Sequence, residues 1–495
     1  MIESLSDAGL IWIALGLPVL GACGIALTGR IPNLREAVTL ITAVATFVVV
    51  VLNLLPRVLA GARPATEPIQ VMGGIELGFA VEPLGMLFAT VASTLWIVNS
   101  IYSIGYMRGN REPRQTPFYI CFAVAISAAL GIAFAGNLFT LFLYYEILTI
   151  STYPLVTHKA NDDARRSGRV YLVLLMATSM ILLLPAIIWT QVATGTLTFA
   201  QGGILAGAGL STGALGFLLA LYIFGIGKAA VMPVHFWLPA AMVAPTPVSA
   251  LLHAVAVVKA GVFTVVKVIV YVFGVDYLAQ SGAGDWLTYV AGFTVICASI
   301  IAIMQDNLKK RLAFSTISQL SYVVLAAAIL TPLALIGAAM HIAAHAISKI
   351  TLFFAAGSIY TSAHYTEISQ LNGIGRRMPW TMGAFAIGAL SMIGLPPTAG
   401  FLSKWFMLSG SWEGENWVAL GVIILSTCLN AAYFLPIIYR AFWLEPPADD
   451  PEHPAHGEGP VPAVLALTLT AAGTLALFFF PEIPLQLATD MMEAP

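Results

Sequence analysis

The chain consists largely of apolar runs that are each long enough to cross a lipid bilayer as a helix. Of its 495 residues, 59% are hydrophobic and only 9% are charged, whereas soluble proteins carry about 25% charged residues. A run of about 20 apolar residues is the length that a membrane-spanning helix requires. The sequence therefore predicts an all-α polytopic membrane protein. Fourteen spans are expected, near residues 8–28, 36–60, 82–106, 117–135, 137–157, 169–192, 212–240, 246–274, 286–304, 311–330, 332–361, 380–410, 417–443 and 461–485.

The distribution of basic residues supports this number of spans. With fourteen spans, fifteen of the 22 Lys and Arg residues fall in loops on one side and only Arg57 and Arg63 on the other, while Lys267 and four further lysines lie within spans. The fifteen are Arg30, Arg35, Arg108, Arg111, Arg114, Lys159, Arg165, Arg166, Arg169, Lys309, Lys310, Arg311, Arg376, Arg377 and Arg440. Loops rich in Lys and Arg stay in the cytoplasm. We therefore expect both termini on the outer side of a bacterial or archaeal cell membrane.

Two of the predicted spans contain proline near their centres. Pro233 interrupts the span at 212–240, and Pro396 and Pro397 interrupt the span at 380–410. Proline removes a backbone donor and clashes with the preceding helical turn. Broken helices at corresponding positions of two halves are typical of inverted repeats that enclose a transport site. The alternative is that the prolines only kink packed helices.

Four lysines and one acid lie inside apolar spans, where charge is costly. Each charged side chain at the centre of a membrane costs about 2.5–3.5 kcal/mol on insertion scales. Such residues are typical of ion pathways and proton relays. The five residues are Glu146, Lys228, Lys259, Lys349 and Lys404.

Glu146 and Lys228 are predicted to act as a pair whose members change their charge state near neutral pH. A static ion pair between two helices is the alternative. His253 and Lys259 share the span at 246–274 and are six residues apart, so water would have to join them. Lys267, near the outer end of that span, is expected to extend its amine toward the interface. Glu82, which opens the third span, is also expected at the interface.

His341, His345 and Lys349 follow one another at intervals of four residues and share one helix face. Histidine titrates near neutral pH and passes protons, so this stripe predicts a relay. Hydrogen bonds between helices are the alternative. A metal site is disfavoured, because no further acid or histidine lies in the segment. The four cysteines stand alone, without the spacing of an iron–sulfur or zinc site, so no cofactor is expected.

Several longer strings resemble the antiporter-like subunits shared by complex I, the Mrp cation/proton antiporters and membrane-bound hydrogenases. They are YYEILTISTYPLV, GIGKAAVMPVHFWLPAAMVAPTPVSALLHAVAVVKAG, DNLKKRLAFSTISQL, HAISKITLFFAAG and GLPPTAGFLSK, and they span about residues 80–445. The resemblance implies that Glu146 is the fifth-helix glutamate and Lys228 its broken-helix partner. It implies that Lys259 bridges the halves, that Lys349 with His341 and His345 forms the central connection, and that Lys404 lies at the exit.

The same resemblance implies the domain organisation. It consists of a three-helix segment at 1–107, inverted repeats at 117–274 and 285–443, a cytoplasmic loop at 444–460, and a final helix and tail at 461–495. The length of the chain is most like that of a D-type Mrp subunit, which implies a proton-translocating subunit of a multi-subunit Na⁺ or K⁺/proton antiporter.

Two alternatives stay open: a pump subunit in a complex I-like oxidoreductase or a hydrogenase, and the membrane subunit of an inorganic-carbon uptake complex. In each case the expected partners are other membrane subunits and the lipid bilayer, without nucleic acid, and the chain is no enzyme on its own.

Overall fold

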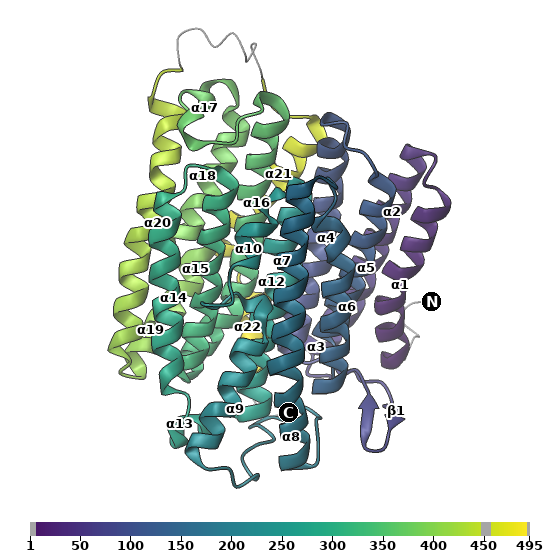
Figure 1. Ribbon diagram of the computed structural model, residues 1–495, viewed down its shortest axis with the longest axis vertical. Helices are drawn as coiled ribbons and strands as arrows, with labels where there is room; N and C mark the ends of the chain where they lie inside the picture. The colour runs from purple at the N-terminus through teal and green to yellow at the C-terminus, as the bar shows by residue number, and fades with distance from the viewer. Residues whose placement is uncertain (1–5, 447–456, 493–495) are drawn as a thin grey trace.

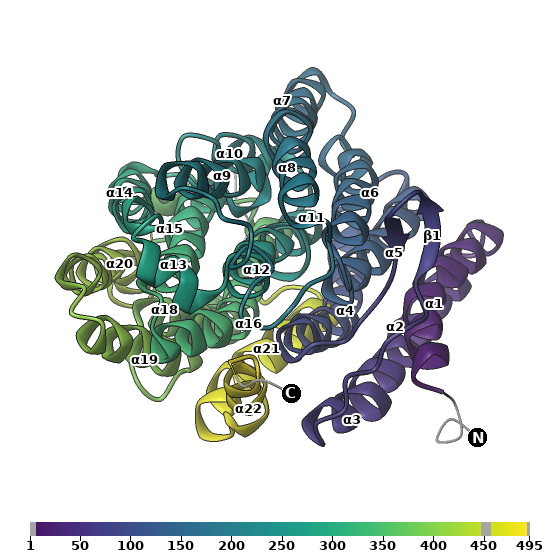
Figure 2. The same cartoon turned by 90° about the horizontal axis from the view of Figure 1, so that it is seen from below.

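The computed structural model describes residues 6–446 and 457–492, and nearly all regular structure in them is helical (Figure 1). The first helices are α1 (Asp7–Leu27), α2 (Pro32–Phe47) with its continuation α3 (Leu55–Leu59), and α4 (Pro83–Gly109). Helices α1 and α2 lie at one edge of the molecule, and α4 lies between them and the centre (Figure 2). A short antiparallel hairpin, β1 (Ile69–Met72) and β2 (Ile75–Leu77), lies between α3 and α4. The prediction of an all-α polytopic membrane protein is confirmed.

The remaining helices form two consecutive groups. The first group comprises α5 (Gln115–Ala133), α6 (Leu138–Val156), α7 (Asp162–Thr178), α8 (Leu184–Thr194), α9 (Thr212–Gly225), α10 (Trp237–Ala240), α11 (Thr246–Ala250), α12 (Val257–Val268) and α13 (Val275–Ser281). The second comprises α14 (Asp285–Met304), α15 (Leu308–Ile329), α16 (Pro332–Ala363), α17 (Ile374–Arg377), α18 (Pro379–Ile393), α19 (Ala399–Glu413), α20 (Trp417–Trp443), α21 (Val461–Phe479) and α22 (Glu482–Asp490). Many begin with proline in the first turn, where its missing N–H has no helical partner to lose.

Within the described residues, 12 helices are long and apolar enough to cross a membrane. Two further apolar helices, Thr212–Gly225 and Pro379–Ile393, are shorter, and each is the first half of a span predicted to be interrupted. The number fourteen therefore stays a prediction. The last span is shorter than expected: α21 ends at Phe479, and α22 begins after Pro481. Most of the predicted loop at 444–460 lies outside the described residues.

Two long spans near the middle of the bundle carry most of the predicted site. The span Thr246–Phe273 includes α11, a π-helical segment (Leu251–Val255) and α12, and it is the most deeply buried of the 12. It lies beside α16, and in a view along the helices both are surrounded by other elements (Figure 2). Ionisable side chains on these two helices are therefore shielded from lipid.

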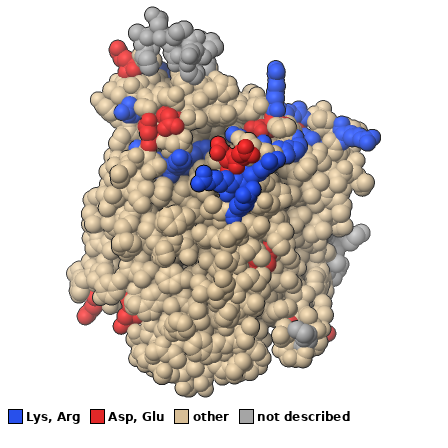
Figure 3. Space-filling model, in the orientation of Figure 1, with Lys and Arg blue, Asp and Glu red and all other residues tan. Residues whose placement is uncertain are grey.

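The loops predicted to be basic meet at one end of the bundle. Arg35 donates to Gln115 Oε1 at 2.7 Å, and Arg108 donates from Nε to Glu36 Oε1 at 3.0 Å. The view in Figure 3 shows Lys and Arg gathered at the upper end of the molecule.

The first and last described segments of the chain lie at the opposite end. Asp7 pairs with Arg57, and Gln486 donates to Leu59 O at 3.1 Å. The first and last described segments thus share the end that has few basic residues.

Candidate functional site

Both predicted helix breaks are present, and glycine and proline produce them. In the first break, α9 ends at Gly225, a single 3-10 turn covers Gly227–Ala229, and Pro233 lies in the turns before α10. In the second, Gly394 adopts a left-handed φ of 91°, and Pro396 and Pro397 separate α18 from α19. A helix that stops in mid-membrane leaves backbone carbonyls without helical donors, and these carbonyls attract cations and N–H groups.

Lys228 lies fully buried in the first break and is held by α6. Its Nζ donates to Tyr145 O at 2.9 Å and to Thr149 Oγ1 at 2.6 Å, and lies 3.2 Å from the centroid of the Tyr145 ring. Gly261 on α12 permits this arrangement, because a Cβ there would come within 2.3 Å of the Lys228 backbone. The ammonium is therefore desolvated but surrounded by oxygen atoms and an aromatic face.

Glu146 adjoins Tyr145 on α6 and is 8% exposed. Within the described part of the chain, neither of its carboxylate oxygens has a hydrogen-bond partner, and no ion pair within 4.0 Å joins it to Lys228. The expected pair is thus not in direct contact: Lys228 Nζ binds Tyr145 O and Thr149 Oγ1, next to Glu146 on α6. A buried carboxylate without a hydrogen-bond partner is costly, and such groups are often found at functional sites.

Lys259 on α12 connects the two halves of the molecule directly. Its Nζ shares a hydrogen bond of 2.5 Å with His345 Nδ1 on α16, and both residues are fully buried. The sequence predicted both residues as relay members without predicting that they touch.

His341 continues this connection toward the second break. Its ring lies 5.9 Å from that of His345, centroid to centroid. His341 Nδ1 is hydrogen-bonded to Ser403 Oγ at 2.9 Å, and Nε2 to Gln319 Oε1 at 3.1 Å. Ser403 is the neighbour of Lys404 in α19, so the histidines connect Lys259 with the second break.

Lys404 binds the end of the broken helix α18. Its Nζ donates to Met392 O at 3.0 Å and to Ile393 O at 2.9 Å, and lies 4.8 Å from the centroid of the Tyr322 ring. The negative end of the helix dipole favours a cation at this position.

Lys349 contacts α15. Its Nζ donates to Ser315 Oγ and, at 3.3 Å, to Leu312 O. The members of the predicted stripe thus have different partners: His345 contacts α12, His341 contacts α15 and α19, and Lys349 contacts α15 one turn from the partner of His341.

His253 lies in the π-helical segment beside Phe353, with 4.7 Å between the ring centroids. It is fully buried, and neither ring nitrogen has a hydrogen-bond partner among the described residues. A π-helical turn inside an α-helix is common at functional sites.

Lys267 corrects one expectation from the sequence. Its side chain is 0% exposed, donates to Ala135 O at 2.7 Å and pairs with Glu82 at 3.1 Å. It does not extend to the interface, because the segments around Phe199 and Ala135 cover the span at the end away from the basic loops. Sequence reasoning also missed Ser315 and Gln319, whose polar side chains within the apolar helix α15 were the available signal.

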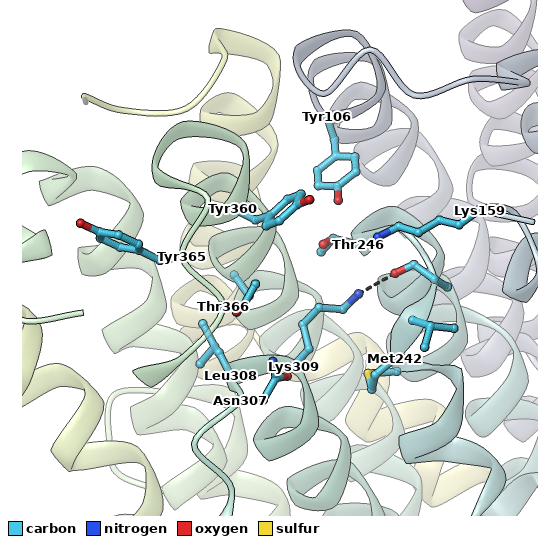
Figure 4. Close-up of a pocket in the computed structure, with 13 residues that line it drawn as sticks. Tyr106, Lys159, Met242, Thr246, Asn307, Leu308, Lys309, Tyr360, Tyr365 and Thr366 are labelled. Carbon is cyan, nitrogen blue, oxygen red and sulfur yellow. Dashed lines mark hydrogen bonds between the residues drawn. The ribbon is translucent and has the colours of Figure 1, made fainter. Parts of the chain in front are cut away.

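A cavity of about 150 Å³ opens at the basic end of the bundle, between α4, α11, α15 and α16. In Figure 4 the side chains of Lys159 and Lys309 point into the same space as the hydroxyl groups of Tyr106 and Thr246. Lys309 Nζ donates to Ala244 O at 2.6 Å. Thr246 opens the helix that carries His253 and Lys259, so the cavity lies at the basic end of that span.

Two titratable groups lie beside this cavity, outside the spans. Partial burial raises the pKa of the Glu112 carboxyl, against the opposing effect of Lys159 and Lys309. Burial lowers the pKa of His158, and the charge of Arg114 adds to this effect. His158 Nε2 lies 3.9 Å from Glu112 Oε2. The basic end therefore holds an acid and a histidine that lie close to each other and to the two lysines of the cavity.

Comparison with known proteins agrees with this geometry. Residues 135–430 match the model of the family described as NADH:quinone oxidoreductase/Mrp antiporter, transmembrane region. The chain is 32% identical over 397 residues to the N subunit of the NADH-quinone oxidoreductase of Desulforudis audaxviator, covering 79% of this chain and 76% of that protein. It is 28% identical over 382 residues to the D subunit of the Na⁺/H⁺ antiporter of Alkalihalophilus pseudofirmus, covering 75% and 76%.

A solved structure shares the fold. A chain of the Mrp complex from Dietzia sp. DQ12-45-1b superposes with a TM-score of 0.82 at 21% identity, over 98% of this chain and 97% of that one. These relatives are subunits of multi-subunit membrane complexes. The resemblance stated from the sequence is confirmed: the chain belongs to the NADH:quinone oxidoreductase/Mrp antiporter transmembrane family.

Proposed function

We propose that the chain is the proton-translocating membrane subunit of a multi-subunit Mrp-type antiporter that exchanges Na⁺ or K⁺ for protons. The observation that carries this proposal is the series of buried ionisable groups that leads from Lys259 to the second helix break. Lys259 contacts His345, His345 lies beside His341, and His341 contacts Ser403 next to Lys404. Buried amines that serve only packing would be replaceable by apolar residues at little cost.

The proposed path begins at the cavity beside Lys159 and Lys309. Protons reach His253 and Lys259 from this end, pass through His345, Lys349 and His341, and leave at Lys404. In this scheme Glu146 controls the protonation of Lys228. When the Glu146 carboxylate is charged, it stabilises the Lys228 ammonium, and when the carboxyl group is neutral, Lys228 gives up its proton. In this scheme the chain moves protons without redox chemistry of its own and depends on partner subunits for cation exchange.

A second candidate is a proton-pumping subunit of a complex I-like NADH-quinone oxidoreductase. The specific observation in its favour is the 32% identity to the N subunit of such an oxidoreductase, against 28% identity to the D subunit of the antiporter. Both functions require the same proton relay inside this subunit. They differ in the process that drives proton movement, which is cation exchange in the first candidate and quinone reduction in the second.

Identification of the neighbouring subunits separates the two candidates. We expect the complex, gently extracted and analysed by mass spectrometry, to contain further Mrp-type membrane subunits. Everted vesicles should show proton efflux on addition of Na⁺ or K⁺. Co-purification of quinone-reducing or hydrogenase subunits, with proton movement that requires a reductant, would replace the first candidate with the second.

The proposal includes an orientation, with the basic end in the cytoplasm, and an inverted relation between residues 117–274 and 285–443. The half-buried Ser167, at the start of α7, lies beside the exposed Arg165 and Arg166. In a variant without the four native cysteines, we expect Ser167→Cys to react with an impermeant maleimide only in everted vesicles. The matched control is Ala206→Cys in the exposed loop before α9, which should react only in intact cells. The reverse pattern would overturn the orientation.

A further inference from the structure

A second buried acid–base pair lies at the end of the molecule away from the basic loops. Lys267 Nζ is 3.1 Å from Glu82 Oε2, and the lysine side chain is 0% exposed while the glutamate is 16% exposed. The pair joins the last turn of α12, in the most deeply buried span, to the residue before α4. The Lys267 side chain is thus fully buried, whereas the Glu82 side chain is partly exposed at the surface.

The surroundings of the pair are asymmetric. The Lys267 ammonium lies 4.4 Å from the centroid of the Phe199 ring and 5.5 Å from that of Phe263. The charged and titratable groups that face the pair are the Arg63 guanidinium and the Tyr271 hydroxyl. The cation is therefore enclosed by aromatic rings and one carbonyl, while the carboxylate also feels the charge of Arg63 near the outer surface.

A polar cavity lies on the outer side of the segments that cover Lys267. It has a volume of about 180 Å³ and is lined by Glu76, Asn137 and Thr198, among others. Asn137 is two residues from Ala135, which accepts a hydrogen bond from Lys267, and Thr198 precedes Phe199. Water can thus approach the outer side of these two short segments.

The position of Lys267 on its helix relates it to Lys259. The two lysines are eight residues apart with Phe263 midway, so all three share one face of α12. Eight residues correspond to about 12 Å along the axis, which is too far for a direct hydrogen bond. A chain of waters along this face would be needed to join them.

We propose that Glu82 and Lys267 form an outward-side proton-exchange site that serves the first half of the molecule, an inference that rests on the proposed proton translocation. The Lys267 ammonium gives one proton to the Glu82 carboxylate, which leaves a neutral amine and a neutral acid. Glu82 then releases that proton to water on the outer side. Lys267 regains a proton from the water chain that leads from Lys259, and the original charges are restored.

A static ion pair that fastens α4 to α12 predicts a different response to arginine. Lys267→Arg preserves the positive charge and its attraction to Glu82, but a guanidinium stays protonated in proteins. If the ion pair only holds the two helices together, Lys267→Arg transports normally. If the pair exchanges protons, we expect the variant to lose transport by about tenfold or more.

The experiment compares Lys267→Arg and Glu82→Gln with the parent in proteoliposomes that contain the whole complex in one orientation. We expect both variants to assemble, to transport about tenfold more slowly, and to lose the dependence of rate on outer pH while keeping the dependence on cytoplasmic-side pH. Asp7→Asn is the control, because it removes an exposed ion pair on the same side and should behave like the parent.

The outcomes are distinct. Normal transport by Lys267→Arg, with unchanged dependence on outer pH, overturns the inference, even if Glu82→Gln fails to assemble. Glu146→Gln, measured in parallel, tests the proposed function itself. If Glu146→Gln abolishes transport and Lys267→Arg does not, only the outward-side site is wrong. If neither variant has an effect, the proposed proton translocation is wrong as well.

Discussion

Glu146→Gln and Lys228→Ala are each expected to abolish proton-coupled cation exchange, by about 100-fold or more, without loss of the assembled complex. Glu146 is the buried acid beside the first helix break, and glutamine has its shape without its charge. Because the carboxylate has no hydrogen-bond partner in the described chain, the amide breaks no contact there. Lys228→Ala removes the ammonium that the proposed scheme requires to change its charge.

The measurement is cation-induced proton movement in everted vesicles, with the amount of protein determined by immunoblot. Lys228→Ala removes the donor to Thr149 Oγ1 and one of the two side-chain donors to Tyr145 O, which costs about 1–3 kcal/mol. A modest fall in thermal stability is therefore expected for this variant and none for Glu146→Gln. Lys310→Ala, at an exposed position, is the control. Normal exchange by either of the first two variants at normal protein level would show that the pair is not a relay.

The architecture could be predicted from the sequence because membrane helices obey a simple rule. Their backbone must be satisfied internally, so apolar length alone locates them. The breaks were predictable too, since Pro233, Pro396 and Pro397 cannot continue a helix in mid-span. The end of α21 was not located correctly, because the residues after Phe479 remain apolar although Pro481 stops the helix.

The identity of the site residues could be predicted from the cost of charge in apolar spans, but their contacts could not. The hydrogen bond between Lys259 and His345 depends on the packing of α12 against α16, which no local pattern reveals. The burial of Lys267 was missed for the same reason, since it is loop segments that cover the span at that end. The sequence correctly placed His341, His345 and Lys349 on one face of a helix. The residues that each of them contacts depend on how the neighbouring helices pack against that face.

The second large effect is expected at Lys349, which packs against α15 and not against the other members of its stripe. Its amine donates to Ser315 Oγ and to Leu312 O, and it lies 5.7 Å from the centroid of the Phe434 ring. A lysine that passes a proton must become neutral for part of the cycle, and burial makes this possible by disfavouring charge. Arginine satisfies the same oxygens but does not release its proton.

Lys349→Arg is therefore expected to keep the charge and the assembled complex but to lose most of the transport, by about tenfold or more in everted vesicles. Lys349→Ala should lose at least as much, and Lys310→Arg, at an exposed position of α15, should transport like the parent. The comparison of the two Lys349 variants decides the role. Parental transport by Lys349→Arg together with failure of Lys349→Ala would mean that this position supplies only a fixed positive charge, and the proton path would then have to pass from His345 to His341 without Lys349.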